Sequence, residues 1–159
     1  MFHSEQYNGP REQNYELVIR QLQALLSGET NRIANLSNAS ALLNQFLESI
    51  NWVGFYLYED GELVLGPFQG MPACVRIPLT RGVCGKAANE RTTVRVANVH
   101  EFPGHIACDA ASLSEIVIPI IKNDEIIGVL DIDSPKLDRF DELDQLYLEK
   151  FVRQLCEFL

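Results

Sequence analysis

The spacing of apolar residues changes once along this chain of 159 residues, and that change constrains the fold more than any other feature. Before residue 50, apolar side chains recur every three or four positions, as Tyr15, Val18 and Leu22 do, and this spacing predicts amphipathic helices. The first predicted helix ends at Ser27-Gly28, a usual helix end. The second contains Ile33, Leu36, Leu43, Phe46 and Leu47.

From Trp52 onward the spacing becomes that of β-strands. Asp60-Gly61 separates "WVGFYLY" from "LVLGPF" and predicts the turn of a hairpin. Shorter strands are expected in "VRIPL" and "TTVRVA", with a short helix in "RGVCGKAANE" between them. The two strongest predicted strands, "SEIVIPI" and "EIIGVLDID", meet at Asn123-Asp124.

The C-terminal segment returns to helical spacing. Asp141 is a candidate N-cap, and the apolar stripe after it consists of Leu143, Tyr147, Phe151, Leu155, Phe158 and Leu159. Helices, then a mostly antiparallel sheet, then a helix make an α+β domain with the helices packed on the sheet. The chain has no internal repeat and no linker-like stretch, so residues 1–159 are predicted to form a single domain.

Charge and composition narrow the range of partners. The net charge of −9 disfavours nucleic acid and anionic membranes, since both require a basic surface. The chain begins without signal-peptide features and has no apolar run near the ~18–20 residues that span a bilayer. We therefore expect a cytoplasmic protein, in which permanent disulfides are disfavoured and the four cysteines are candidates for catalytic, redox or metal-binding roles.

Three of the four cysteines lie outside predicted strands. Cys74 follows the turn-rich "GPFQGMPA", Cys84 lies between two glycines at a predicted helix start, and Cys108 lies in a long loop. We expect these positions to be less buried than a strand interior, and a helix start to lower the pKa of a thiol. Cys156, beside Leu155 on the last helix, is interpreted as a core residue.

A zinc site in this chain would use Cys74, Cys84, His105 and Cys108. The sequence has no Cys-x-x-Cys pair, and ten positions separate Cys74 from Cys84, whereas structural zinc sites usually have tighter ligand pairs. Zinc is therefore the weaker interpretation. His105 by itself is more typical of a loop residue with local hydrogen bonds than of a ligand or a base.

Three acidic residues lie on the two strongest strands. Asp131 and Asp133 are two apart, so both face one side of the sheet, with Ile127 and Val129. Carboxylates on an apolar face are costly unless they lie at a sheet edge, bind a ligand or, for Asp133, cap the turn that follows. Glu115 faces away from Asp131 if a two-residue turn alone sets the register. A bulge or a three-residue loop reverses this, and the sequence leaves both open.

The single tryptophan, Trp52, opens the first predicted strand, and Tyr56 shares its face. Core packing is the usual role of such aromatic residues. The alternative is an aromatic wall for a ligand methyl group or cation. The sequence leaves both interpretations open.

Four segments carry a specific resemblance, in the order "GPFQGMPACVRIPL", "RGVCGKAA", "EFPGHIACDAASLSEIVIPI" and "IIGVLDIDSP". Together they resemble the free methionine-(R)-sulfoxide reductase family, which is built on a GAF domain. The resemblance extends from about Trp52 to Asp141. Generic GAF domains share the sheet and a "GVLDI"-like strand, whereas the three cysteines are specific to this family.

The resemblance implies a set of functional residues. The family's three functional cysteines correspond to Cys74, Cys84 and Cys108. Its substrate-pocket residues correspond to Trp52, Tyr56, Glu115, Asp131 and Asp133, which implies that Glu115 reaches the pocket that holds the aspartates. We predict Cys108 as the attacking thiol, because it lies closest in sequence to Glu115, with Cys74 as the resolving thiol and Cys84 as a second resolving candidate. The sequence ranks Cys108 only weakly above Cys84.

The implied activity is reduction of free L-methionine (R)-sulfoxide through a cysteine sulfenic acid and an intramolecular disulfide. No metal or bound cofactor is expected, and thioredoxin, with thioredoxin reductase and NADPH, is the expected external reductant. The N-terminal helix pair is compatible with a homodimer. Two alternatives stay open: a non-catalytic GAF sensor that reports oxidation through a Cys74–Cys108 disulfide, and a zinc-binding structural domain.

Overall fold

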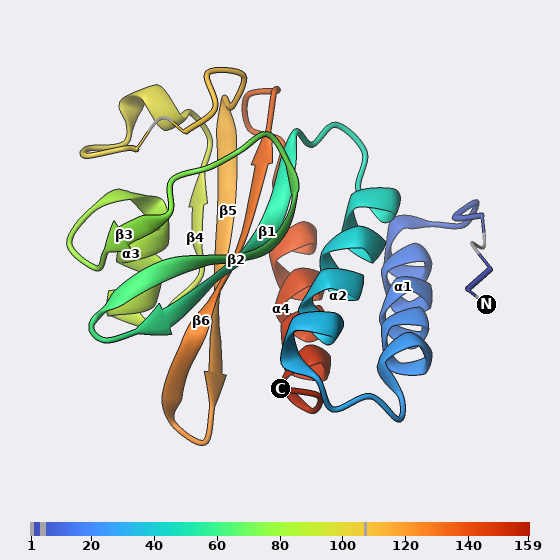
Figure 1. The fold of residues 1–159 in the computed structure, drawn as a ribbon. Coiled ribbons are helices and arrows are strands. Elements are labelled where there is room, and N and C mark those ends of the chain that lie inside the picture. The colour runs from blue at the N-terminus through green and yellow to red at the C-terminus, as the bar shows by residue number, and fades with distance from the viewer. Residues whose placement is uncertain (1, 4–5, 107) are drawn as a thin grey trace.

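Figure 1 shows the fold of the computed structural model, which describes residues 2–3, 6–106 and 108–159. The strands are β1 Trp52–Glu59, β2 Glu62–Gly70, β3 Arg76–Pro78, β4 Val94–Val96, β5 Ser114–Lys122 and β6 Glu125–Ser134. They form one sheet in the order β3-β2-β1-β6-β5-β4, in which all neighbours are antiparallel. The predicted hairpins β1–β2 and β5–β6 are both present.

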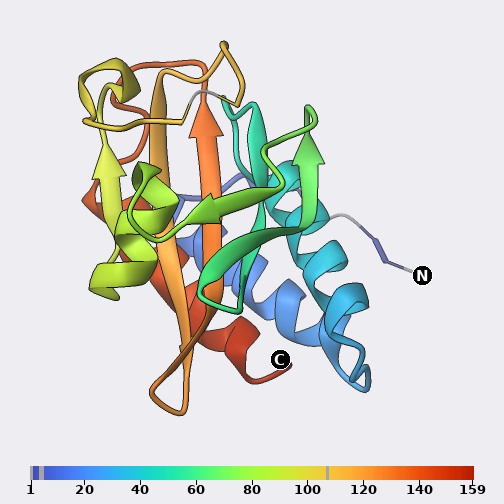
Figure 2. The ribbon, with the colours of Figure 1, turned by 60° about the vertical axis from the view of Figure 1, so that its left-hand side comes forward.

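Helices cover both sides of this sheet. They are α1 Arg11–Leu26, α2 Arg32–Phe46, α3 Gly82–Glu90 and α4 Glu142–Cys156, with a 3-10 turn at Val99–Glu101. Figures 1 and 2 show α1, α2 and α4 together on one side and α3 on the other. This arrangement confirms the predicted α+β class. None of the helices in the described part of the chain is long and apolar enough to cross a membrane.

Local sequence signals set the helix ends. Gly28, the residue after the C-cap Ser27 of α1, adopts a φ of +86°, a conformation that glycine reaches without steric cost. Asn31 caps α2 by accepting a hydrogen bond from the N–H of Ala34 at 3.0 Å. Asp141 and Asp144 form a capping box at the start of α4, which confirms the predicted N-cap.

The β5–β6 hairpin contains the predicted two-residue turn and, beyond it, a β-bulge. Lys122 pairs with Glu125 across the turn, whereas Ile120 pairs with Gly128, so Ile127 is an extra residue on β6. The prediction that Ile127 lies on the same face as the aspartates is wrong. The bulge turns Ile127 toward the other side of the sheet, where it packs with the residues under α1, α2 and α4.

The bulge also decides where Glu115 points. Glu115 pairs with Asp133, and Val117 pairs with Asp131. Residues paired across an antiparallel ladder point to the same side of the sheet, so all three carboxylates share one face. The bulged alternative is therefore confirmed, and the uninterrupted two-residue register is wrong.

Strand alternation gives the sheet two different faces. The side toward α1, α2 and α4, here called the helix-side core, buries Phe55, Ile116, Leu130 and Ile132 among its strand residues. The side toward α3, here called the pocket-side core, buries Trp52, Tyr56, Val117 and Val129, together with Cys84 from α3. The three carboxylates belong to the pocket side, so the functional candidates lie under the single helix α3.

Candidate active site

A small cavity lies on the α3 side of the sheet, between strands β1, β5 and β6 and the loops that precede β3 and β5. Its volume is about 40 Å³, which holds about three water molecules at ~10–15 Å³ each. Seven of the eight residues predicted for the site line it, namely Trp52, Tyr56, Cys84, Cys108, Glu115, Asp131 and Asp133. The eighth, Cys74, is bonded to Cys108.

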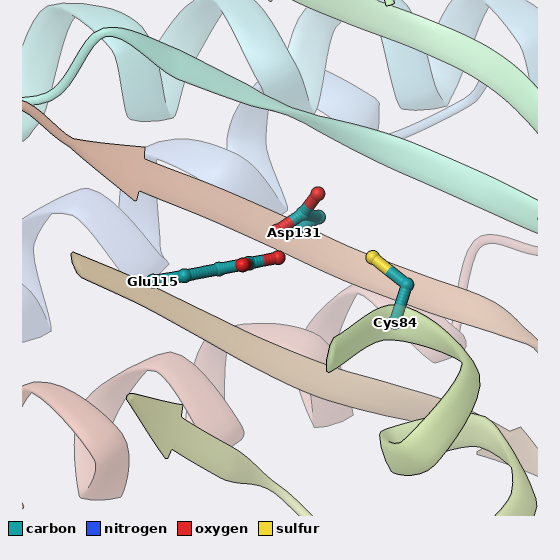
Figure 3. A group of neighbouring side chains, drawn as sticks. All are labelled: Cys84, Glu115 and Asp131. Carbon is teal, nitrogen blue, oxygen red and sulfur yellow. The ribbon is translucent and has the colours of Figure 1, made fainter. Parts of the chain in front are cut away.

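Three buried side chains from three different elements meet in this cavity (Figure 3). Cys84 on α3, Glu115 on β5 and Asp131 on β6 place one sulfur and two carboxylate oxygens within 4.8 Å of one another. Glu115 and Asp131 are each only 6 % exposed. One oxygen of Asp131, Oδ1, is buried without a hydrogen-bond partner among the described residues. An acidic cluster this poorly solvated favours a positively charged or hydrogen-bonding ligand.

Burial raises the pKa of each of these acids. The pKa of Glu115 rises to about 8, first because burial disfavours its charged form and then because Asp133 repels it. Burial is also the first cause that raises the pKa of Asp131 well above its ordinary value, followed by repulsion from Glu115. The pKa of Asp133 is raised in the same way, by burial and by Asp131. Near neutral pH the cavity therefore holds a carboxylic acid that can donate a proton.

Cys84 lies in the first turn of α3, as predicted, but it is buried. Gly85 allows this, because a Cβ there would lie 2.7 Å from the carbonyl oxygen of Pro78, and only glycine lets α3 approach so closely. Burial, and then Asp131, raises the pKa of the Cys84 thiol well above its ordinary value. The prediction that the helix start lowers the pKa of this thiol is therefore wrong, because desolvation outweighs the helix dipole here.

A disulfide joins Cys74 to Cys108 across 34 positions of sequence, with Cα atoms 5.9 Å apart. Cys108 is exposed and Cys74 half-buried, as expected for these two. Cys84 and Cys156 are free, and Cys156 packs at the margin of the helix-side core. The structure contradicts the zinc site that the sequence analysis considered, because the disulfide uses two of the four proposed zinc ligands.

The trio of Cys84, Glu115 and Asp131 is close enough to hold a metal ion. Metal ligands must be deprotonated, however, and burial raises the pKa of all three groups. The donor set is therefore better suited to exchange protons with a substrate than to retain a metal.

Trp52 and Tyr56 wall one side of the cavity and also hold the loop that carries Cys74. Their rings stack with centroids 5.9 Å apart. The indole N–H of Trp52 donates to the carbonyl of Met71 at 3.1 Å, and the hydroxyl of Tyr56 donates to the carbonyl of Cys74 at 2.9 Å. Core packing is therefore confirmed for both residues, which also line the cavity, and their contact with a ligand stays a prediction.

Asn51 and Ser112 belong to the site although the sequence singled out neither. The Asn51 side chain donates to Asp109 Oδ2 and to Ser112 Oγ, both at 3.0 Å, and so fixes the loop that follows Cys108. Ser112 also hydrogen-bonds the Asp133 carboxylate. The turn signal "DAAS" was available in the sequence, but its partner Asn51 lies 58 positions away from Asp109.

The idea that Asp133 caps the turn after β6 is wrong. The neighbouring Ser134 does so, since its hydroxyl accepts the N–H of Lys136 at 3.1 Å. This leaves the Asp133 side chain on the cavity.

Comparisons with known proteins agree with this geometry. Residues 38–157 match the family model of the GAF domain. The free methionine-R-sulfoxide reductase of Escherichia coli is 57 % identical over 145 residues, which cover 91 % of this chain and 88 % of that protein. The reduced form of fRMsr of Staphylococcus aureus has a TM-score of 0.90 at 56 % identity, covering 98 % of this chain and 99 % of that one. The free methionine-R-sulfoxide reductase from Neisseria meningitidis, in complex with its substrate, has a TM-score of 0.93 at 42 % identity, covering 99 % and 95 %.

The match over residues 38–157 and the antiparallel sheet flanked by helices define the class as that of GAF-domain proteins. The identities of 42–57 % over nearly the whole chain narrow the class further. The chain belongs to the free methionine-R-sulfoxide reductase family of GAF-domain proteins. This confirms the family predicted from the four sequence segments.

Proposed function

We propose that this protein is a thiol-dependent reductase that converts free L-methionine (R)-sulfoxide to L-methionine. Its family is an oxidoreductase family, and the relative from Neisseria meningitidis forms a complex with its substrate. The observation that carries the proposal is the Cys74–Cys108 disulfide beside a cavity in which Glu115 holds a proton near neutral pH. A reducing thiol pair and a proton donor are the two components that sulfoxide reduction requires.

In the first step, Cys108 attacks the sulfoxide sulfur as a thiolate, and Glu115 donates its proton to the sulfoxide oxygen. The bond between the substrate sulfur and oxygen breaks, and the oxygen ends on Cys108 as a sulfenic acid. The methionine sulfur gains two electrons, which the Cys108 sulfur loses. We assign the attack to Cys108 rather than Cys84, because the raised pKa of the buried Cys84 lowers its thiolate fraction.

In the second step, the Cys74 thiolate attacks the sulfenic sulfur of Cys108. The disulfide forms, and the hydroxide of the sulfenic acid leaves as water after it takes up the proton that the Cys74 thiol gave up. A dithiol reductant such as thioredoxin, itself reduced by thioredoxin reductase and NADPH, then restores both thiols by exchange. Cys84 remains the alternative resolving thiol, since it lines the same cavity as Cys108. No bound cofactor takes part in this scheme.

The acidic and aromatic groups suit a free amino acid. We assign Asp131 and Asp133 to the α-ammonium group, a positive charge that a peptide-bound methionine lacks. The ammonium would compensate for the burial of these carboxyl groups and favour their charged forms. Trp52 and Tyr56 would contact the S-methyl group with their ring faces.

The size of the cavity supports placing the disulfide form at the end of the proposed cycle. A volume of about 40 Å³ is too small for methionine sulfoxide, because it holds about three waters. Cleavage of the disulfide would release Cys108 and its exposed loop from Cys74 and allow the cavity to widen. The reduced form is therefore the form that binds substrate in this proposal.

The remaining proposals concern the setting of the reaction. We propose that residues 1–159 act as one domain in the cytoplasm, where a thioredoxin-type reductant keeps the disulfide reversible. A homodimer through the N-terminal helices stays a prediction. Light scattering of the purified protein at two concentrations tests it.

The test of the function is turnover of resolved methionine sulfoxides in the presence of thioredoxin, thioredoxin reductase and NADPH. We expect reduction of the free R form, and no reduction of the free S form or of a peptide-bound sulfoxide. The same assay with dithiothreitol separates a failure of the reductant from a failure of the chemistry. Absence of methionine with either reductant contradicts the proposal and favours the redox-sensor alternative.

A further inference from the structure

His105 lies in the same loop as Cys108, and the scheme above gives it no role. Its Nε2 atom is 3.6 Å from Oε2 of Glu115, and the two side chains are 15 % and 7 % exposed. This distance is too long for a hydrogen bond. Catalytic hydrogen bonds are often long without substrate, and a loop shift of under ~1 Å would form this one.

His105 differs from every other titratable group around the cavity. No lysine or arginine among the described residues lines the cavity, so His105 is its one nitrogen base. The titratable groups that face the cavity with it are Tyr56 on β1, Cys84 on α3, Cys108 and Asp109 in its own loop, Glu115 on β5, and Asp131 and Asp133 on β6. Burial lowers the pKa of His105, whereas it raises the pKa of Glu115 and Asp131. His105 is therefore neutral, with a free nitrogen lone pair, under conditions in which the buried acids hold their protons.

The reaction itself requires such a group. One proton must leave the Cys108 thiol before attack, and one proton must reach the sulfoxide oxygen. Glu115 supplies the second proton and is then left as a carboxylate in a buried acidic site, which is costly. A base 3.6 Å from Glu115, in the loop that carries Cys108, is placed to connect the two proton transfers once the loop shifts.

We propose that His105 carries the proton of the Cys108 thiol to Glu115. This inference rests on the proposed reductase function. His105 Nε2 accepts the thiol proton as Cys108 attacks, and the imidazolium then returns a proton to the Glu115 carboxylate. The thiol proton thus replaces the one that Glu115 gave to the oxygen. One thiol and one sulfoxide become one sulfenic acid and one methionine, and His105 ends neutral.

The test compares His105→Ala and His105→Gln with the matched control His100→Ala. His100 is exposed, lies in the 3-10 turn before the same loop and does not line the cavity. We expect both His105 variants to lower kcat about 100-fold, with KM for the free sulfoxide within about twofold. Added imidazole should restore part of the rate of His105→Ala, whose missing ring leaves space, and none of the rate of His105→Gln. The control should keep the wild-type rate.

The pH dependence provides a readout that a structural role would not change. The wild-type rate should fall on the acid side as His105 takes up a proton before the reaction. It should fall on the alkaline side near pH 8, as Glu115 loses its proton. In His105→Ala the acid-side fall should no longer follow the titration of His105 and should follow loss of the Cys108 thiol proton instead.

Each remaining outcome counts against the inference. A His105→Ala protein that keeps the wild-type rate overturns it. So does one that loses the same factor at every pH without imidazole rescue, because that result assigns His105 a structural role only. An inactive wild-type protein would refute the reductase function itself, which distinguishes the two failures.

Discussion

Leu130 and Asp131 are neighbours in β6 and are both buried, yet they face environments of opposite character. Leu130 is fully enclosed by the apolar side chains under α1, α2 and α4. Asp131 faces the cavity beside Glu115 and Cys84, with one carboxylate oxygen unpartnered among the described residues. The same strand thus stabilises the fold with one face and carries an unfavourable buried acid on the other.

The two faces of the sheet therefore have different roles, one in the stability of the fold and the other in the proposed chemistry. Burial on the helix side removes apolar surface from water and lowers the free energy of the folded state. Burial on the pocket side raises the pKa of Glu115, Asp131 and Asp133, and so stores free energy that a bound ammonium or a proton transfer can release. Substitutions on the two faces should therefore affect different measurements.

The largest effect is expected from Cys108→Ser. Loss of the attacking thiol should reduce methionine formation by at least about 1,000-fold, while the free energy of unfolding of the reduced protein changes little, because Cys108 is exposed. Rapid-quench measurement of methionine checks this. Full activity of this variant would mean that Cys84 is the attacking thiol, and Cys84→Ser should then be the inactive protein.

The adjacent pair Leu130→Ala and Asp131→Asn tests the comparison directly. Leu130→Ala should lower the free energy of unfolding by about 2–5 kcal/mol through a cavity in the helix-side core, with KM unchanged for the molecules that remain folded. Asp131→Asn should leave stability equal or higher, because a neutral amide replaces a buried acid, and should raise KM about tenfold or more. Denaturant unfolding and steady-state kinetics measure both. Equal destabilisation by the two variants would contradict the distinction between the faces.

Glu115→Gln should lose activity and gain stability at alkaline pH. Without the proton donor, kcat should fall about 100-fold. The folded-state pKa of Glu115 is about 8 against an ordinary 4.5, so the unfolded chain ionises first and wild-type stability is lost as pH rises between these values. Glutamine does not titrate, and the stability of the variant relative to wild type should therefore increase by about 3 kcal/mol from pH 5 to pH 8. Urea unfolding at both pH values tests the sign, and parallel pH dependence of the two proteins would refute it.

The redox state of the Cys74–Cys108 pair is expected to have a smaller effect, on the affinity for the product. The narrow cavity of the disulfide form should weaken the affinity for L-methionine at least about tenfold relative to the reduced protein. Calorimetric titration of each form measures this. Equal affinities would show that the cavity opens without cleavage of the disulfide.

The smallest effect is expected from Cys156→Ser. Cys156 lies on α4 at the margin of the helix-side core and does not line the cavity. The rate of sulfoxide reduction should equal that of the wild type within about twofold. A large loss of activity would mean that Cys156 takes part in the thiol chemistry.

Much of the fold could be predicted because the relevant signals are local. The period change at Trp52, the turn at Asp60-Gly61 and the cap at Asp141 each act within a few residues, and each is present. The β5–β6 register could not be predicted in this way. It depends on one extra residue, Ile127, whose bulge is set by packing on both faces of the sheet rather than by the turn.

The site was predicted less completely than the fold. Cys84 was expected at a helix start with a lowered pKa. The sequence shows the helix start, but it does not show that the thiol is buried beside three acids of other elements. Asn51 hydrogen-bonds Asp109, which lies 58 positions away in sequence. His105 lies beside Glu115, which belongs to β5. Long-range contacts and desolvation are properties of the folded chain, so a pass along the sequence does not reveal them.

The most direct test of the central claim is a single turnover without external reductant. Fully reduced protein, with four free thiols, is mixed with excess free (R)-sulfoxide, and methionine, free thiols and disulfide-linked peptides are quantified. We predict about one methionine per protein molecule, a fall to two free thiols, and a Cys74–Cys108 peptide pair. Formation of that disulfide without methionine would contradict the account and identify the cysteine pair as a redox sensor.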